Sequence, residues 1–316
     1  MVIGKKRLKT KRTLQRQAKS ERSAVLVVNT FSRHGEHFFF QAMDELARHG
    51  IWISATYPVR DPSRLRDTVA EAVNSGHTLV IVGGGDGTIS SIVEFFAYKD
   101  VVLGILPLGT GNSFARSLGI PLNLKGAVDV IVDGKVADVD LGKVGDFLFA
   151  NLATIGISVD VSRRSPVTLK RSFGMLAGVL AAIPAVVAHR PFKCRIEMAN
   201  EEHTVETHEV IIANGSFFGV SQLAPDASPD SGHLVVYTMD TPNRWLMLRL
   251  WVALLLGRAR SFPEIRYFRT KDVIIEATPG HDIDVDGEIL TETPAHFTLL
   301  PQALKVMTPL SFVDKK

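Results

Sequence analysis

One segment constrains the fold of this chain more than any other. It is the apolar run Leu79–Val82, followed directly by Gly83-Gly84-Gly85-Asp86-Gly87-Thr88. Such a branched apolar run is typical of a strand buried on both faces in a parallel sheet. Glycines let backbone amides approach a ligand closely, and successive amides ahead of a helix form a nest that binds anions. The segment therefore predicts a strand–turn–helix unit that binds phosphate.

Asp86 does not fit a site for phosphate alone, because a carboxylate repels a phosphate unless a cation or a nucleoside hydroxyl lies between them. We therefore expect a nucleotide accompanied by Mg²⁺. The alternative is a glycine-rich turn from strand to helix that binds no ligand.

Strand and helix patterns alternate over the first part of the chain. The strand-like runs are 24–28, 51–56, 79–82 and 101–106, and the helix-like runs are 36–48, 61–75 and 88–98. This alternation is typical of a doubly wound α/β fold with a largely parallel sheet. Ligands bind at the carboxyl ends of the strands in such sheets. We therefore expect Asn29, Thr56, Gly84–Thr88 and Pro107–Asn112 to converge on one crevice.

After about residue 138 the pattern changes to short strands separated by turns. The strand-like segments are 147–155, 192–199, 204–213, 233–239, 272–277, 282–286 and 296–300, which predict a mainly β second domain, a sandwich. Two apolar stretches, Phe173–Ala188 and Trp245–Leu256, interrupt it. Both are shorter than the ~20 residues that span a bilayer. We expect buried helices there, or helices that line a lipid pocket or touch a membrane surface.

The first 22 residues contain nine Lys or Arg and one acid, and no apolar core of a secretory signal. We expect a disordered basic arm. Three roles are open for it: a solvated tail, a tether to an anionic membrane surface, and an RNA-binding arm. The tether is the functional role that we retain, and we expect no nucleic-acid partner. The single cysteine, Cys194, excludes a disulfide framework and fits a reducing compartment.

A second glycine loop, Gly109-Thr110-Gly111-Asn112, follows the next predicted strand. Its glycines, hydroxyl and amide suit contacts with phosphate and ribose. Either loop alone is a weak signal. Two loops of this composition at successive strand ends strongly favour a nucleotide site.

A third candidate segment is Asp282-Ile283-Asp284-Val285-Asp286-Gly287-Glu288. It begins like a calcium-binding loop, but Thr293 occupies the position that needs a bidentate Glu, and the flanks look like strands rather than helices. In a strand, the two apolar residues face the core and the acids face outward. A solvated acidic strand edge is the alternative without function.

Together these segments resemble the diacylglycerol kinase catalytic-domain family, which includes bacterial YegS-like lipid kinases and is related to sphingosine and ceramide kinases. The resemblance covers nearly everything from residue 23 onward, with further matches at Val139–Gly142, Ala213–Gly215, Ala224-Pro225 and Asp286–Glu288. It implies an α/β nucleotide-binding domain like those of phosphofructokinases and NAD kinases, a β-sandwich second domain, and an active site in the cleft between them. It also implies ATP, Mg²⁺ and transfer of the γ-phosphoryl to a lipid hydroxyl.

The resemblance also assigns residues. Glu288 is expected to accept the proton of the lipid hydroxyl, with Asp286 as its partner or an alternative base. The expected nucleotide contacts are Asn29, Thr56, Gly84, Gly85, Asp86, Gly87, Thr88, Ile89, Ser90, Gly109, Thr110 and Asn112. Asp86 is expected to hold Mg²⁺ through water together with Asp140, and Asp230 marks the family's structural Mg²⁺ site.

The chain departs from the family pattern at several serines. Ser113 stands where bacterial diacylglycerol kinases typically have Asp, which keeps a sphingoid base or ceramide open as the acceptor. Ser231 replaces an Asp next to Asp230, which puts the structural Mg²⁺ site in doubt. The remaining alternatives to a diacylglycerol kinase are an NAD kinase-like enzyme and a non-catalytic homologue that binds lipid or nucleotide.

The expected organisation is a basic arm over 1–22, an ATP-binding domain over 23–138 and a lipid-substrate domain over 139–302. The C-terminal tail, about 303–316, is able to return to the first domain. We expect a cytoplasmic protein at the inner membrane surface. A homodimer is compatible with the sequence.

Overall fold

The structure is a computed structural model that describes residues 8–31, 35–164, 188–199, 201–217, 222, 224, 226–243, 245–246, 249 and 265–314. The chain forms two compact units. The first comprises Met1–Asp140 and Pro301–Lys316, and the second comprises Leu141–Leu300. The sequence placed these boundaries near residues 138 and 302.

The first unit is built on a parallel sheet. Its strands are β1 (Ser23–Asn29), β2 (Trp52–Val59), β3 (Leu79–Gly84) and β4 (Val102–Pro107), in the order β4-β3-β1-β2. The end of β15 (Ala295–Thr308) lies beside β4, which brings the C-terminal segment back to this unit. Every residue of β3 and β4 is buried, as expected for central strands of a sheet covered on both faces.

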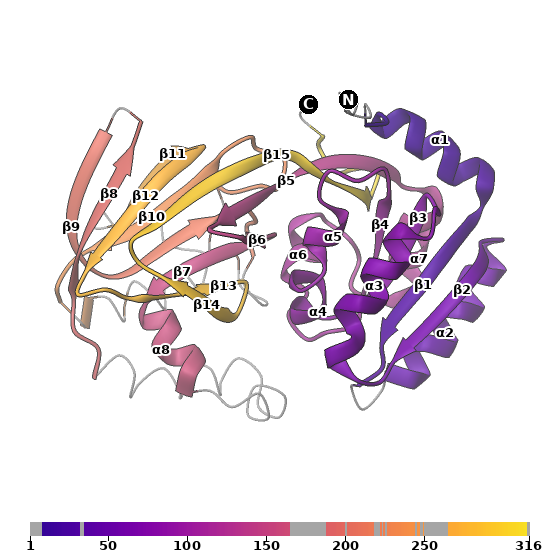
Figure 1. Cartoon of the computed structure of the whole chain (residues 1–316), viewed down its shortest axis with the longest axis horizontal. Coiled ribbons are helices and arrows are strands. Elements are labelled where there is room, and N and C mark those ends of the chain that lie inside the picture. The colour runs from indigo at the N-terminus through magenta and orange to yellow at the C-terminus, as the bar shows by residue number, and fades with distance from the viewer. Residues whose placement is uncertain are drawn as a thin grey trace, which may run out of the picture. The chain divides into compact units, whose positions relative to one another are not determined.

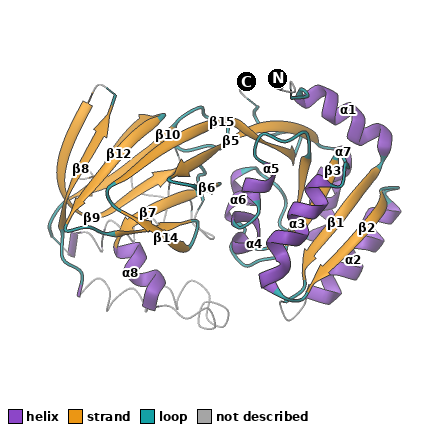
Figure 2. Cartoon of the chain, viewed as in Figure 1, coloured by secondary structure: helices purple, strands orange, loops and turns teal. Residues whose placement is uncertain are grey.

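Helices connect these strands (Figures 1 and 2). They are α2 (Gly35–Arg48), η1 (Pro62–Arg64), α3 (Leu65–Asn74), α4 (Asp86–Ser90), α5 (Val93–Phe96), α6 (Ser113–Ser117) and α7 (Leu124–Asp133). The single helix expected over 88–98 is wrong, because the segment forms two short helices, α4 and α5. Ser91 donates a hydrogen bond to the carbonyl of Thr88 at 3.0 Å. Serine and the branched residues that follow it favour such a break.

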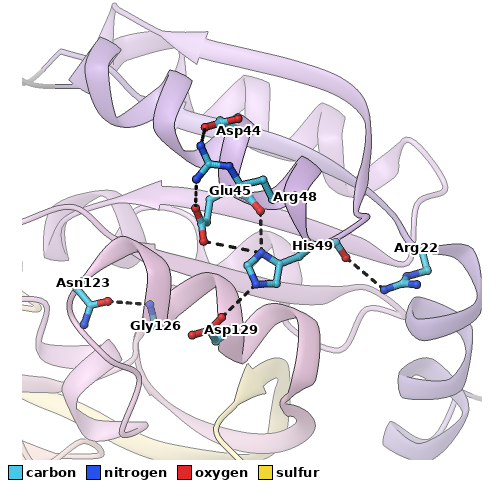
Figure 3. Close-up of polar contacts among 8 residues, drawn as sticks. All are labelled: Arg22, Asp44, Glu45, Arg48, His49, Asn123, Gly126 and Asp129. Atoms are coloured by element: carbon cyan, nitrogen blue, oxygen red, sulfur yellow. Dashed lines mark hydrogen bonds and ion pairs between the residues drawn. The ribbon is translucent and has the colours of Figure 1, made fainter.

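A polar cluster joins α2 to α7 and to the start of β1 (Figure 3). The Nδ1 of His49, just after α2, lies 2.9 Å from the carbonyl of Glu45, and its Nε2 lies 3.4 Å from Asp129 on α7. Arg22 donates to the carbonyl of His49 at 3.2 Å. These contacts fix the end of α2 far from the loops that follow β1 and β3.

The expectation of a disordered arm over 1–22 is wrong for the described part of that segment. Residues Lys11–Glu21 form the helix α1, which Thr10 caps by accepting a hydrogen bond from the amide of Thr13. Leu14 is fully buried, and Lys11 pairs with Asp314 at 2.6 Å. Lys, Arg and Gln favour helices, and the buried Leu14 together with the pair Lys11–Asp314 holds α1 on the first unit.

The second unit is mainly antiparallel β-structure. The strand β5 (Lys135–Val144) begins in the first unit and ends in the second. The other elements of the second unit are β6 (Phe147–Phe149), β7 (Leu152–Gly156), α8 (Ile157–Arg164), β8 (Phe192–Met198), β9 (Glu201–Ala213), β10 (Leu234–Asp240), β11 (Ile265–Thr270), β12 (Asp272–Thr278), β13 (Asp282–Val285) and β14 (Glu288–Glu292). The order is β14-β13-β7-β9-β8-β12-β15, and β10 pairs with β9 and β11. Phe149, Phe192 and Phe297 lie in its main core.

The apolar stretches expected at 173–188 and 245–256 lie almost wholly outside the described residues. Within the described part of the chain, no helix is both long enough and apolar enough to cross a membrane.

Candidate active site

The candidate nucleotide site of the first unit lies where the direction of winding in the parallel sheet reverses. The chain passes from β1 to β2 on one side and from β3 to β4 on the other. Ligands of open α/β sheets bind at the carboxyl ends of the strands at this position. Asn29 ends β1, and Gly84 ends β3. The side-chain amide of Asn29 donates to the hydroxyl of Thr88 at 3.0 Å, so the structure brings these expected residues together.

The two glycine loops touch each other. Gly84 is the register partner of Pro107, and the amide of Leu108 donates to the carbonyl of Gly84 at 2.9 Å. A Cβ added at Gly109 would lie 2.5 Å from the Cα of Gly85. No side chain fits between the loops, so glycine at both positions is a requirement of packing as well as of ligand access.

Polar side chains within the second loop hold its shape. Asn112, in the left-handed conformation, accepts a hydrogen bond from the amide of Gly109 at 2.9 Å and donates to its carbonyl at 2.7 Å. Arg116 donates to the carbonyl of Gly111 at 2.7 Å. The side chain of Asn112 is therefore occupied inside the loop, whereas Gly109 and Thr110 are exposed.

Asp86 links the first loop to the second. Its carboxylate accepts a hydrogen bond from the amide of Ser113, at the start of α6. Burial raises the pKa of Asp86 above its ordinary value, while hydrogen bonds from Ser113 and Asn112 and the charge of Arg116 act in the opposite direction. The carboxylate of Asp86 therefore connects the two loops, and it lies close to the position where phosphate is expected.

One expected nucleotide contact, Thr56, takes a different place. The strand containing Thr56 continues to Val59, so Thr56 lies in the middle of β2 and not at its carboxyl end. Its register partner is Leu26, three residues before Asn29, which corresponds to ~10 Å along the strand. β2 is an edge strand, in which a proline such as Pro58 is tolerated. Pro58 therefore does not end the strand, and no residue after Thr56 marks where the strand ends. The side chain of Ile89 is buried.

The second unit contains its own candidate region, the hairpin turn between β13 and β14. Asp286 and Gly287 both have positive φ, of 50° and 101°, as the tightest hairpin turns require. The amide of Gly287 donates to the carboxylate of the buried Asp284 at 2.7 Å. The strands on both sides agree with the rejection of a calcium-binding loop, which needs flanking helices.

The carboxylate of Asp286 is anchored by backbone amides. It accepts hydrogen bonds from Ala150 at 2.8 Å, Asn151 at 3.0 Å and Leu152 at 2.9 Å. The same segment binds Asn214, whose side chain donates to the carbonyl of Ala150 at 2.8 Å. Residues from three distant parts of the chain therefore meet here, and Asp286 fixes the geometry of the turn.

Glu288 lies two residues further and is exposed. Among the described residues, no hydrogen bond or ion pair of its side chain is present. A carboxylate that is held on a hairpin and has no partner among the described residues is suited to accept a proton from a substrate hydroxyl. The structure thus gives the two acids different surroundings, with Asp286 bound to the backbone and Glu288 open.

Comparison with known proteins agrees with both units. The family model for the diacylglycerol kinase catalytic domain matches residues 23–144, and the model for the YegS C-terminal NAD kinase beta sandwich-like domain matches residues 152–308. Diacylglycerol kinase of Staphylococcus epidermidis is 30% identical over 241 residues, covering 75% of this chain and 76% of that protein. Diacylglycerol kinase of Staphylococcus haemolyticus is 31% identical over 248 residues, covering 78% and 75%.

The chain belongs to the diacylglycerol kinase catalytic-domain family. It is therefore a lipid kinase. The fold agrees: a crystal structure of a diacylglycerol kinase from Bacillus anthracis str. Sterne, 22% identical, aligns with a TM-score of 0.76 over 92% of this chain and 99% of that one. A second structure from the same organism aligns with a TM-score of 0.80, covering 92% and 97%.

Two of the acids expected to bind metal in this family member, Asp140 and Asp230, are buried. Asp140 is fully buried and accepts a hydrogen bond from the amide of Gln302 at 2.8 Å. Asp230 is buried in the second unit, in a turn where Ser231 donates to the carbonyl of His233 at 2.8 Å. Within the described part of the chain, no three His, Cys, Asp or Glu side chains are grouped to hold a metal ion.

Sequence reasoning missed one acid of this lipid kinase. Glu209, on β9, is 1% exposed, and its Oε2 accepts a hydrogen bond from the amide of Ser158 on α8 at 2.9 Å. The only signal was a glutamate next to the apolar run Val210–Ala213. Burial, with Asp284 as a further contribution, raises the pKa of Glu209 to about 8, although the amides of Ser158 and Ile157 lower it.

Proposed function

We propose that this lipid kinase transfers the γ-phosphoryl group of ATP to the hydroxyl of diacylglycerol and so produces phosphatidic acid. The observation that carries this proposal is the difference between the two acids of the hairpin turn. Asp286 is bound by three backbone amides, and Glu288, two residues away, is exposed. The names of the staphylococcal relatives support diacylglycerol as the acceptor.

In this proposal the glycine loops of the first unit hold the nucleotide. Amides of Gly85–Thr88 and the exposed Thr110 contact its phosphates, since a Cβ at Gly87 would meet no atom of the described residues within 4 Å. The first intrahelical hydrogen bond of α4 runs from Ile89 to Gly85, which leaves the preceding amides for a ligand. Asn29 supports the loop through Thr88.

The oxygen ligands of the first unit fit Mg²⁺. This ion keeps several waters and binds through one or two carboxylates together with substrate phosphates, so it does not need a cluster of protein ligands. Asp86, beside the loops, is the carboxylate that we propose for it, and Asp140 is too firmly held by Gln302 to be a direct ligand. When bound, the ion neutralises charge on the phosphates.

Glu288 then acts as the general base. A lipid hydroxyl is a weak nucleophile, and a carboxylate within hydrogen-bond reach accepts its proton as the phosphoryl group is transferred. Asp286 positions Glu288 by fixing the hairpin turn on the segment Ala150–Leu152. In this proposal the first unit binds the phosphoryl donor and the second unit supplies the base for the acceptor hydroxyl.

The acceptor is identified by supplying the purified protein with radiolabelled ATP, Mg²⁺ and a total lipid extract. We expect the label in phosphatidic acid. Label in a phosphorylated sphingoid base or ceramide would replace diacylglycerol as the acceptor, in keeping with Ser113. A protein that binds ATP but labels no lipid would refute the proposal and favour a non-catalytic homologue.

We also propose that the enzyme works at the inner membrane surface as a peripheral cytoplasmic protein, held in part by α1. Arg12, Arg16 and Lys19 are exposed and follow each other at helical spacing, on the side of α1 away from the buried Leu14. Near an anionic bilayer each basic residue contributes up to about 1 kcal/mol at low salt. α1 thus offers a basic stripe to anionic headgroups.

The basic stripe gives a prediction that does not require deletion of the helix. Replacing Arg12, Arg16 and Lys19 by glutamine should weaken binding to anionic vesicles about tenfold to a hundredfold at low salt, and less at high salt. The measurement is co-sedimentation with vesicles of neutral or anionic lipid. The matched control removes three exposed charges elsewhere, at Lys125, Lys193 and Lys271. Equal binding by both variants would eliminate the stripe as a tether.

A further inference from the structure

A groove of about 550 Å³ lies at the start of α1 and contains none of the residues of the candidate active site. It is lined by Leu8–Arg12, Tyr98, Asp138, Pro301, Gln302 and Lys305, all of which belong to the first unit. Pockets for small ligands measure about 300–1,000 Å³, whereas one water takes up about 30 Å³. The groove therefore has room for a small organic ligand.

The charges at the start of α1 have the wrong sign for a helix on its own. Its first turn contains no acid and begins with Lys11 and Arg12, although a helix N-terminus favours negative charge. Lys9 lies just before the helix, and its ammonium donates to the neutral side chain of Gln17 at 2.7 Å. Asp314 pairs with Lys11 at 2.6 Å, which leaves Lys9 and Arg12 without an ion pair in the described part of the chain. Positive charge beside helix amides is an arrangement that binds anions.

A buried lysine is the second and independent sign of a ligand. Lys305, on β15, is 5% exposed and lines the groove. Among the described residues its ammonium forms neither a hydrogen bond nor an ion pair. Such an ammonium is costly, because its charge is removed from water and its donors are not satisfied. An anionic oxygen bound in the groove would compensate both costs.

Asp138 adds an acceptor to the same groove. Its Oδ1 is buried and has no hydrogen-bond partner within the described ranges. Burial raises the pKa of Asp138, against the charges of Lys305 and Lys11, which lower it, and the charge of Asp314 adds to the rise. Lys305 is thus near enough to influence Asp138, yet the two do not form an ion pair. A ligand that fits both offers an acceptor to Lys305 and a donor to Asp138.

We propose that this groove binds a phosphate ester whose alcohol carries a further hydroxyl group, as glycerol phosphate does. The phosphate accepts hydrogen bonds from Lys305, Arg12 and the first amides of α1, and the hydroxyl donates to Asp138. Such an ester occurs free in solution and as the headgroup of an anionic lipid, and the groove recognises the chemistry that both share. The bound ester connects α1 to β5 and β15, the strands that run from the first unit into the second.

The test is calorimetric titration of the wild-type protein with glycerol phosphate, inorganic phosphate and glycerol. Glycerol phosphate should bind about tenfold more tightly than inorganic phosphate, and glycerol should not bind at the same concentrations. Lys305→Met should weaken the binding of both phosphates about tenfold to a hundredfold, since a hydrogen bond to a charged group is lost. Asp138→Leu should remove the preference for the ester and keep the binding of inorganic phosphate.

Lys125→Met is the matched control, because it removes the same charge from an exposed position on α7, and its affinities should equal those of the wild type. Wild-type protein that does not bind glycerol phosphate, or binds it no better than inorganic phosphate, would overturn the inference even if the variants do not fold. So would equal affinity of wild-type and Lys305→Met protein for glycerol phosphate, because binding at the glycine loops does not depend on Lys305.

Vesicles identify the source of the ester. Phosphatidylglycerol and phosphatidylserine carry the same net charge, so a preference for phosphatidylglycerol vesicles reports recognition of the headgroup hydroxyls and not of charge alone. A preference that Asp138→Leu removes would support the inference and assign a lipid headgroup to the groove. Binding of soluble glycerol phosphate by the wild type, without a preference between the vesicles, would support it and assign a free ester.

Discussion

Replacing Glu288 by glutamine should lower kcat by about 10²–10⁴-fold, the usual contribution of a general base, while ATP still binds. Glutamine keeps the size of the side chain and cannot accept the proton. The exposed position of Glu288 and its lack of a partner among the described residues predict that the fold is unaffected. Steady-state kinetics and nucleotide titration of the same preparation measure the two effects separately.

The matched control is Glu292→Gln. Glu292 is exposed on the same strand, β14, and lies at the end of the hairpin away from the turn. Its kcat should equal that of the wild type. A Glu288→Gln enzyme with wild-type turnover would refute the role of Glu288, and equal losses in both variants would indicate damage to the hairpin.

Gly87→Ala should weaken ATP binding without destabilising the protein. A Cβ at Gly87 would meet no atom of the described residues within 4 Å, and alanine favours a helix over glycine by ~1 kcal/mol. The melting temperature should stay constant or rise. The KM for ATP should nevertheless increase about tenfold or more, because the new methyl group occupies the place of the phosphates.

Gly109→Ala provides the contrast. Its Cβ would lie 2.5 Å from the Cα of Gly85 and 2.9 Å from the Oδ1 of Asn112, so both stability and ATP binding should fall. Gly280→Ala, where the Cβ meets only one atom at 3.7 Å, should change neither. An unchanged KM for ATP in Gly87→Ala would show that the first loop does not bind the phosphates.

The parts of the site that the sequence predicted best depend on local chemistry. The strand before Gly83 is a run of apolar residues that ends at glycines. The turn at Asp286 follows a strand of alternating apolar and acidic residues, and it places Asp286 and Gly287 at positive φ, as a tight hairpin turn requires. The contact between the two glycine loops followed from placing both at adjacent strand ends. Such features are encoded within about ten residues.

The features of the site and fold that could not be predicted from the sequence depend on contacts between residues far apart in the chain. The carboxylate of Asp286 is anchored by the amides of Ala150–Leu152, which lie more than 130 residues earlier in the chain. No pattern in the sequence indicates this contact. The docking of α1 depends on the burial of Leu14. Thr56 was misplaced because an edge strand has no composition that marks its end. Glu209 is recognisable only once its neighbours are known to be buried.

The most direct test of the central claim is one reaction that contains γ-labelled ATP, Mg²⁺, dispersed diacylglycerol and NAD. The structure and the family membership of the chain predict label in phosphatidic acid and none in NADP. Label in NADP with none in lipid would contradict the account, because the glycine loops would then serve a nucleotide acceptor and Glu288 would have no lipid hydroxyl to deprotonate.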